Sequence, residues 1–210
     1  MNPTADLRSL LLGSSLPTAI AAFCLLHPSA HAQTWDGGGA DNSTLTANNW
    51  NPNTTPTGGT QSLTFAGSTR TSVVWDGVNS VAPVNFYGIT FASGAAAFTI
   101  NNGTQNTFQF VNTASSTIIL NSSSNLQTLK PQVNVFYTGT KTIDGGTSGL
   151  ALDGGIRFRG DSMTGTQNNP LILTGTADST TASIIQAGFT GSTTHSLTKN
   201  GSGKWTVTGN

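Results

Sequence analysis

Aspartates are the residues of this 210-residue chain that could do acid–base chemistry, because the sequence contains no glutamate. A polysaccharide hydrolase or lyase would need two of these carboxyl groups close together around the bond to be cleaved. Five of the seven aspartates after residue 33 adjoin a glycine, a pairing typical of turns. We therefore interpret them as turn residues and predict no catalytic site. The seven are Asp36, Asp41, Asp76, Asp144, Asp153, Asp161 and Asp178.

Two Asp-Gly-Gly turns offer a candidate metal site. Asp144 and Asp153 are nine residues apart, and carboxylate and carbonyl oxygens are the ligands that Ca²⁺ prefers. They could share one ion only if both turns lie on the same edge of the fold. The spacing matches no defined calcium loop, so we predict no metal and no cofactor, with this pair as the alternative. Asp36 and Asp41 form a similar pair.

Two further features could bind a partner. Arg159-Gly160-Asp161 is the tripeptide that integrins bind when a loop tip displays it, and here it follows an expected strand. Its alternative interpretation, which we favour, is an ordinary turn. The tryptophan rings, Trp50 among them, could stack on sugars if they are exposed. Because the chain has few large apolar residues, a place in the core is the favoured alternative for these rings.

The net charge and the small number of cysteines and histidines exclude several classes of function. Eight basic and eight acidic residues give a formal net charge of zero, so no patch for strong nucleic-acid binding is expected. A single cysteine, Cys24, rules out an intramolecular disulfide and a thiolate zinc site. His195 is the one histidine after residue 33, and it has no acid or nucleophile beside it. We therefore expect this histidine on the surface. No Gly-x-Ser-x-Gly elbow is present that would place it in a serine-hydrolase site.

The first 32 residues have the marks of a secretory signal peptide. A lone basic residue, Arg8, precedes an apolar stretch that ends in Ala30-His31-Ala32. Cleavage after Ala32 would leave residues 33–210, which is the length of one domain. No second stretch is long and apolar enough to span a membrane. The sequence therefore predicts an exported protein, located at the cell surface, in the outer membrane or outside the cell.

Short clusters of Val, Ile, Thr and Phe alternate with Asn, Asp and Gly turns from residue 33 onward, and no window shows a helical period. Their starts are roughly 8–14 residues apart, which is the spacing of an all-β sandwich, barrel or solenoid. The expected strands are Ser62–Phe65, Thr71–Trp75, Asn85–Phe91, Ala97–Ile100, Thr107–Val111, Thr117–Leu120, Val133–Tyr137, Lys141–Ile143, Gly155–Phe158, Leu171–Thr174, Ala182–Ile185, Ser196–Lys199 and Lys204–Thr208.

Similarity between segments of the sequence favours one of these architectures. The segment 63–68 reappears 26 residues later as 89–94, Trp35-Asp36-Gly37 returns as Trp75-Asp76-Gly77, and 171–175 has an echo in 205–209. Together these matches indicate a unit of about 20–30 residues, within the range of solenoids. We therefore predict a parallel β-helix, whose inward apolar residues stack from turn to turn. A β-sandwich of the jelly-roll type is the alternative.

The segment 196–210 closely resembles the autotransporter-associated β-strand repeat, also called the passenger-associated transport repeat. That pattern reads Leu-x-Lys-x-Gly-x-Gly-x-Trp/Leu-x-Leu-x-Gly, and Val207 here replaces the usual Leu. Physically the segment is a strand, a turn and a second strand, with Leu197, Trp205 and Val207 expected to point inward. The matching residues are Leu197, Lys199, Gly201, Gly203, Trp205 and Gly209.

The resemblance implies a right-handed β-helix exported through a bacterial cell envelope, as a fragment or short relative of an autotransporter passenger. We accordingly predict a structural or adhesion protein without catalysis. A secreted carbohydrate-active enzyme and a carbohydrate-binding module are the alternatives. Expected partners are surface glycans or host proteins, together with a second copy bound through the C-terminal strand edge. Unpaired strand edges favour such association.

Overall fold

β-Branched and aromatic clusters form strands along the described chain, as their preference for pleated backbone predicts. The structure, a computed structural model, describes residues 32–77, 85–111, 114–136, 139–158, 167–186 and 193–209. It is nearly all-β, with 48% strand and 2% helix. Residues 1–31 of the expected signal peptide and the whole Arg159-Gly160-Asp161 tripeptide lie outside the described residues. Within the described ranges, no helix is long and apolar enough to cross a membrane.

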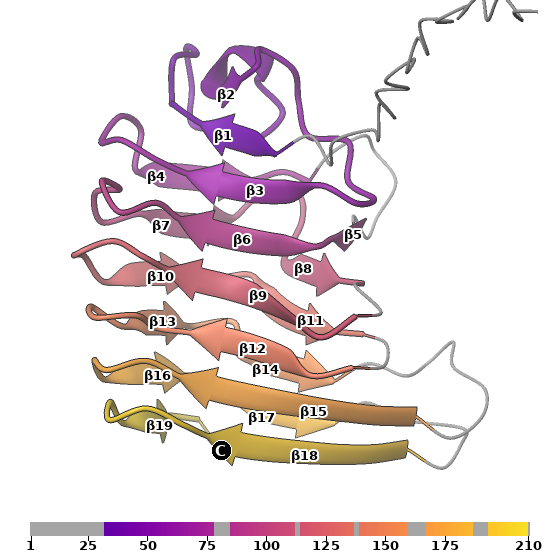
Figure 1. Ribbon diagram of the computed structural model, residues 1–210. Helices are drawn as coiled ribbons and strands as arrows, with labels where there is room; N and C mark the ends of the chain where they lie inside the picture. The colour runs from indigo at the N-terminus through magenta and orange to yellow at the C-terminus, as the bar shows by residue number, and fades with distance from the viewer. Residues whose placement is uncertain are drawn as a thin grey trace, which may run out of the picture.

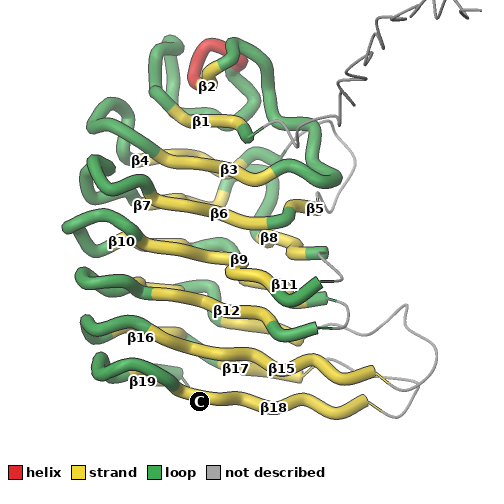
Figure 2. The backbone as a smooth tube through the Cα atoms, viewed as in Figure 1, coloured by secondary structure: helices red, strands yellow, loops and turns green. Residues whose placement is uncertain are grey.

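The strands form three sheets (Figures 1 and 2). The eight-stranded sheet holds β1 (Gln33–Trp35), β2 (Trp50–Asn51), β3 (Ser62–Phe65), β6 (Gly88–Phe91), β9 (Ser116–Asn121), β12 (Lys141–Asp144), β15 (Gln167–Thr174) and β18 (Thr193–Lys199). The six-stranded sheet holds β4 (Ser72–Trp75), β7 (Thr99–Asn102), β10 (Gln127–Leu129), β13 (Leu150–Leu152), β16 (Ser179–Thr181) and β19 (Trp205–Val207). The five-stranded sheet holds β5 (Asn85–Phe86), β8 (Thr107–Phe110), β11 (Gln132–Val135), β14 (Ile156–Phe158) and β17 (Ile184–Gln186).

From β3 onward the chain visits the three sheets in turn, and from β6 onward each described strand pairs in parallel with the strand one turn earlier. The result is a β-solenoid of about six turns. Figure 1 shows a right-handed path from the N-terminal end at the top to the C-terminus at the bottom. The predicted parallel β-helix is therefore confirmed. The jelly-roll alternative is wrong, because among the described strands only β1 and β2 pair antiparallel.

The predicted repeat coincides with the stacking register in one of the three places. Leu63-Thr64-Phe65 of β3 pairs residue for residue with Ile89-Thr90-Phe91 of β6, which confirms a 26-residue turn. The other two matches are not stacked. Trp35-Asp36-Gly37 ends β1 in the eight-stranded sheet, whereas Trp75-Asp76-Gly77 ends β4 in the six-stranded sheet. They share the chemistry of a turn, with a left-handed glycine after the aspartate in both.

The second unstacked match is the echo of 171–175 in 205–209. Leu171 lies on β15 in the eight-stranded sheet and pairs with Leu197 of β18. Trp205 lies on β19 in the six-stranded sheet and pairs with Ser179 of β16. The similarity therefore reflects strand composition and not one turn of the solenoid.

Large apolar side chains fill the inside of the stack. Phe65 and Phe91 are register partners, and their rings stack with centroids 5.4 Å apart. On the six-stranded sheet, the centroid of the Trp75 ring lies 4.4 Å from that of the Phe108 ring. The Trp75 indole nitrogen donates to the Thr107 carbonyl oxygen at 3.0 Å. Such aromatic contacts add about 0.5–1.5 kcal/mol per pair beyond the area that they bury.

The N-terminal end of the solenoid is closed by a cap, residues 33–51, that includes the short helix η1 (Ala47–Asn49). Strand β2 pairs antiparallel with β1 and covers the edge of the eight-stranded sheet. Ser43 forms a parallel bridge to Val74 and covers the edge of the six-stranded sheet. The Trp35 and Trp50 rings, both fully buried, meet edge to face at 5.2 Å beneath this cap.

Five strands were not expected from the sequence: β1, β2, β10, β13 and β16. All five have only two or three residues, and β1, β10 and β16 each begin with a buried polar residue, namely Gln33, Gln127 and Ser179. Gln127 begins β10 and Ser179 begins β16, yet both side chains are buried. Gln127 points inward because its amide is satisfied there: it accepts from the Phe98 backbone N–H at 2.7 Å and donates to the Ala96 carbonyl oxygen at 2.8 Å.

Candidate functional site

Each aspartate that accepts a hydrogen bond from the described residues does so within its own turn or from the neighbouring turn of the stack. Asp36 accepts from the Gly38 backbone N–H at 3.0 Å, and Asp144 from that of Gly146 at 2.8 Å. Asp178 accepts from the Lys204 backbone N–H at 2.8 Å. These bonds stabilise turns, as the sequence predicted for aspartates beside glycine.

Asp41 and Asp76 belong to the N-terminal cap and the turn that it covers. Asp41 accepts from the Thr46 hydroxyl at 2.7 Å and from the Ser43 backbone N–H at 3.0 Å. These bonds hold the pKa of Asp41 below its usual value, the Thr46 hydroxyl most of all. Asp76 accepts from the Ser43 hydroxyl and from the Thr104 backbone N–H. The Asp41 carboxylate therefore holds the cap together, and the Asp76 carboxylate ties the cap to the stack.

The structure does not bring Asp144 and Asp153 together at one edge. Asp144 ends β12, at the corner between the eight-stranded and six-stranded sheets. Asp153 follows β13, at the next corner, between the six-stranded and five-stranded sheets. The condition for a shared calcium ion is therefore not met. In the described part of the chain, no group of three or more His, Cys, Asp or Glu side chains could hold a metal ion.

Trp50 cannot stack on a sugar, because its ring is 0% exposed, and this candidate was wrong. The ring packs against Trp35 and against Phe65, whose centroid is 5.9 Å away. Its indole nitrogen donates to the Thr44 carbonyl oxygen at 2.9 Å. The favoured interpretation of Trp50 as a core residue is confirmed.

His195 and Lys141 are ionisable side chains that the fold partly or wholly encloses. The His195 ring, expected at the surface, is half-buried 4.7 Å from the Phe158 ring, and burial lowers its pKa. Lys141 is fully buried at the start of β12. Its ammonium donates to the Ala114 carbonyl oxygen at 2.9 Å, and burial lowers its pKa as well. Neither side chain had been singled out as buried from the sequence.

The repeat-like segment 196–210 forms the last described turn of the solenoid. Leu197 and Val207 occupy inward register positions, since their partners Leu171 and Thr181 are buried. Their side chains are nevertheless 51% and 50% exposed. Trp205 is half-buried, and its indole nitrogen donates to the Thr174 carbonyl oxygen at 3.1 Å. The predicted inward direction is confirmed, but no described residue covers these side chains from below.

The glycines and the lysine of the motif close the turn between β18 and β19. Gly201 has φ +75°, and a Cβ there would collide with the Gly175 carbonyl oxygen of the turn above. Gly203 approaches the Ala177 backbone in the same way. The Lys199 ammonium donates to the Gly201 carbonyl oxygen at 2.6 Å. The spacing of the motif therefore fits close stacking of one corner on another, and Gly209 follows the final strand.

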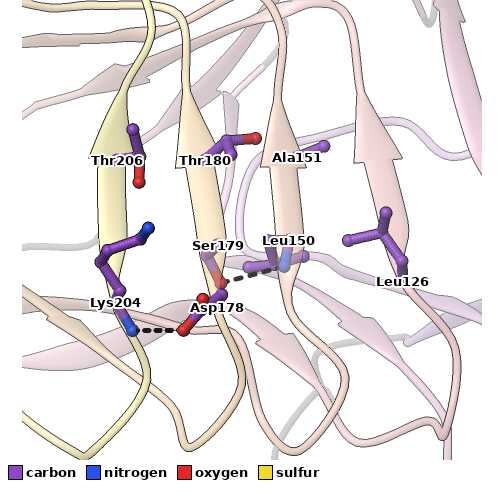
Figure 3. Close-up of a pocket in the computed structure, with 8 residues that line it drawn as sticks. All are labelled: Leu126, Leu150, Ala151, Asp178, Ser179, Thr180, Lys204 and Thr206. Carbon is purple, nitrogen blue, oxygen red and sulfur yellow. Dashed lines mark hydrogen bonds between the residues drawn. The ribbon is translucent and has the colours of Figure 1, made fainter.

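A shallow groove of about 250 Å³ runs along the stack on the six-stranded sheet (Figure 3). Its outer row consists of Ala151, Thr180 and Thr206, which are register neighbours on β13, β16 and β19. Ala151 is the smallest of them and forms a dent. Leu126, half-exposed, lies beyond Ala151 and gives the groove an aliphatic wall.

The other end of the groove is charged. Asp178 and Lys204 line it next to the hydroxyls of Thr180 and Thr206. Ser179, at the base, is buried and its hydroxyl accepts from the Leu150 backbone N–H at 3.1 Å. The groove thus combines an aliphatic wall, hydroxyls and one charge of each sign. No sequence pattern predicts this groove, because its residues come from four turns that only the strand register brings side by side.

Comparison of the chain with protein-family models, with curated proteins and with solved structures finds no match in any of the three.

Proposed function

We propose that the chain is an exported β-solenoid that acts at the cell surface as a structural or adhesion scaffold, without catalysis. The observation that carries this proposal is the solenoid itself, in which every described turn is used to stack on its neighbours. The signal-peptide pattern before residue 33 and the resemblance of 196–210 to passenger repeats support export as an autotransporter-like passenger fragment.

The separate placement of the aspartates favours a scaffold over a carbohydrate-active enzyme. A glycosidase needs two carboxyl groups on either side of one bond. Asp36, Asp144 and Asp178 instead each bind backbone N–H groups at different turns. A panel of plant and bacterial polysaccharides incubated with the protein tests this point. Product release that disappears in an aspartate-to-asparagine variant would establish the enzyme.

Export is tested by expressing the full chain in a Gram-negative bacterium and fractionating the cells. We expect the protein in the outer-membrane or extracellular fraction, with an intact mass that begins at Gln33. Protease added to whole cells should degrade it while leaving a periplasmic marker intact. A protein that keeps Met1 in the exported fraction, or that stays in the cytoplasm, would contradict the proposal.

Carbohydrate binding is a second candidate function, and the groove of Figure 3 favours it. The Thr180 and Thr206 hydroxyls, with the charged groups of Asp178 and Lys204, are groups that can hydrogen-bond to sugar hydroxyls. Leu126 beside them offers an aliphatic surface that suits the apolar face of a sugar ring. Ala151→Arg should fill the dent and abolish binding in a panel of neutral and acidic oligosaccharides. Thr128→Arg, the next position along the same row, is the matched control. Binding that both variants keep, or lose equally, would remove the groove from consideration.

The partner that we propose for the C-terminal edge is a second copy of the chain. Strands β18 and β19 each pair on one side, with β15 and β16, and no described strand lies on the other side. Such an edge carries unpaired N–H and C=O groups and is a template for another strand. Sedimentation velocity of the purified chain should show association that depends on concentration.

A further inference from the structure

The outward face of the six-stranded sheet carries a straight row of hydroxyl groups that follows the stack. Its strands pair in parallel, so one outward position of each strand lies beside the same position of the next. Neighbouring strands are about 4.8 Å apart, and the hydroxyls recur at that spacing. Ala151 interrupts the row and forms the dent of the groove in Figure 3. The row consists of Ser72, Thr99, Thr128, Ala151, Thr180 and Thr206.

The groove is long and narrow, and it crosses the strands. One side is the part of the hydroxyl row from Ala151 to Thr206. The other side consists of the half-exposed Leu126 side chain and the charged side chains of Asp178 and Lys204. From β10, which directly follows Leu126, to β19 there are three strand spacings, or about 14 Å. A ligand that fills the groove is therefore an extended chain that runs along the solenoid axis.

We propose that this groove binds a linear, uncharged polysaccharide of β-1,4-linked sugars, laid along the solenoid axis with one sugar unit per turn. This inference rests on carbohydrate binding, the second function proposed above, and gives that site its ligand class. A sugar unit in an extended β-1,4-linked chain is about 5 Å long, close to the strand spacing of about 4.8 Å. Successive sugars therefore meet equivalent positions on successive turns, and about three units fill the groove.

The chemistry of the groove favours an uncharged chain with flat ring faces. Asp178 and Lys204 carry opposite charges, so the groove has no net charge that would attract an acidic polysaccharide. The Asp178 carboxylate accepts from the Lys204 backbone N–H at 2.8 Å and is exposed, so its remaining lone pairs can accept from sugar hydroxyls. The Leu126 side chain suits the apolar face of a ring. An α-1,4-linked chain curls, and its units would leave the straight row.

Isothermal titration calorimetry with linear oligosaccharides of two to six units tests the ligand class. Cello-, manno- and chito-oligosaccharides are β-1,4-linked, and the α-1,4-linked maltooligosaccharides are the matched control. At least one β-1,4-linked series should bind, about tenfold tighter at four units than at two and little tighter beyond. Maltooligosaccharides that bind as tightly at equal length would overturn the inference while leaving carbohydrate binding intact. Absence of binding by every series at millimolar concentration would overturn both.

Thr180→Val tests the hydroxyl row at the centre of the groove. Valine has nearly the same shape and suits a strand, so the substitution removes the hydroxyl and keeps the fold. Binding of the tetrasaccharide should weaken about two- to tenfold. Thr142→Val, also half-buried but on β12 of the eight-stranded sheet, is the matched control and should bind like the parent. Unchanged binding by Thr180→Val, or an equal loss in both variants, would overturn the placement of the chain along this row.

Discussion

Trp50→Ala should unfold the N-terminal cap and lower the stability of the whole solenoid. The indole is fully buried between Trp35 and Phe65, and it also binds the Thr44 carbonyl oxygen. Because the cap covers the edges of β1 and β4, its loss would expose the strand edges and the apolar interior of the first turn. In a stack where each turn contacts only its neighbours, such a loss at an end propagates inward.

The magnitude follows from the two kinds of contact that the substitution removes. Truncating a buried Trp to Ala costs about 3–5 kcal/mol. Leaving the Thr44 carbonyl oxygen without its donor adds about 1–3 kcal/mol if water does not reach it. These terms overlap, so we expect a loss of about 4–6 kcal/mol. That corresponds to a fall of roughly 10–20 °C in Tm for a domain of this size.

Urea unfolding followed by far-UV circular dichroism measures this loss. Trp50→Phe keeps an aromatic ring against Trp35 but loses the hydrogen bond, so about 1–3 kcal/mol is expected. Leu45→Ala, a half-exposed residue of the same cap, is the control and should change stability by less than about 1 kcal/mol. If Trp50→Ala lies within about 1 kcal/mol of the parent, the cap does not close this end and our account of it is wrong.

Two further substitutions test the corner and the buried charge. Gly146→Ala should destabilise the protein by about 3 kcal/mol or more, because φ is +59° and a Cβ would collide with the Asn121 carbonyl oxygen. Gly94→Ala is the control: it has open space around it and should be near neutral in the same urea assay. Since burial lowers the pKa of Lys141 from its ordinary 10.5, the unfolded chain binds more protons between the two values, and stability should rise with pH through that window. Unfolding midpoints of Lys141→Met should lack this rise, and an equal rise in both proteins would refute the assignment.

The sequence was sufficient for the fold class because apolar side chains mark most of the inward positions. The match of Leu63-Thr64-Phe65 with Ile89-Thr90-Phe91 is a true stacking register, and the turn length follows from it. The hydrophobic pattern of the sequence was insufficient to predict strands whose inward positions are polar. Gln127 and Ser179 are buried through hydrogen bonds to backbone groups of the adjacent turn, and a pattern of hydrophobicity cannot anticipate partners about 30 residues away.

The candidate sites were harder to predict than the fold, for a related reason. A motif such as Asp144-Gly145-Gly146 reports local backbone geometry, which the structure bears out in the Gly146 N–H bond to Asp144. Whether two such motifs share an edge depends on which of the three corners each one occupies. The groove on the six-stranded sheet shows the same dependence, since Ala151 and Thr206 become neighbours of Thr180 only through the register.

The three corners of the solenoid differ in how much sequence they accept, and this difference bears on a display function. At the first corner, buried polar groups bind the next turn: the Asn121 amide donates to the Gly149 carbonyl oxygen at 2.7 Å. The connections there have four to seven residues, the shortest between Thr174 and Ser179 and the longest between Phe91 and Thr99. The corner from the five-stranded back to the eight-stranded sheet ranges from Phe86–Gly88 to Phe158–Gln167. Because the number of residues between strands varies more at that corner than at the first, we expect ligand-binding loops of the proposed surface scaffold to evolve there.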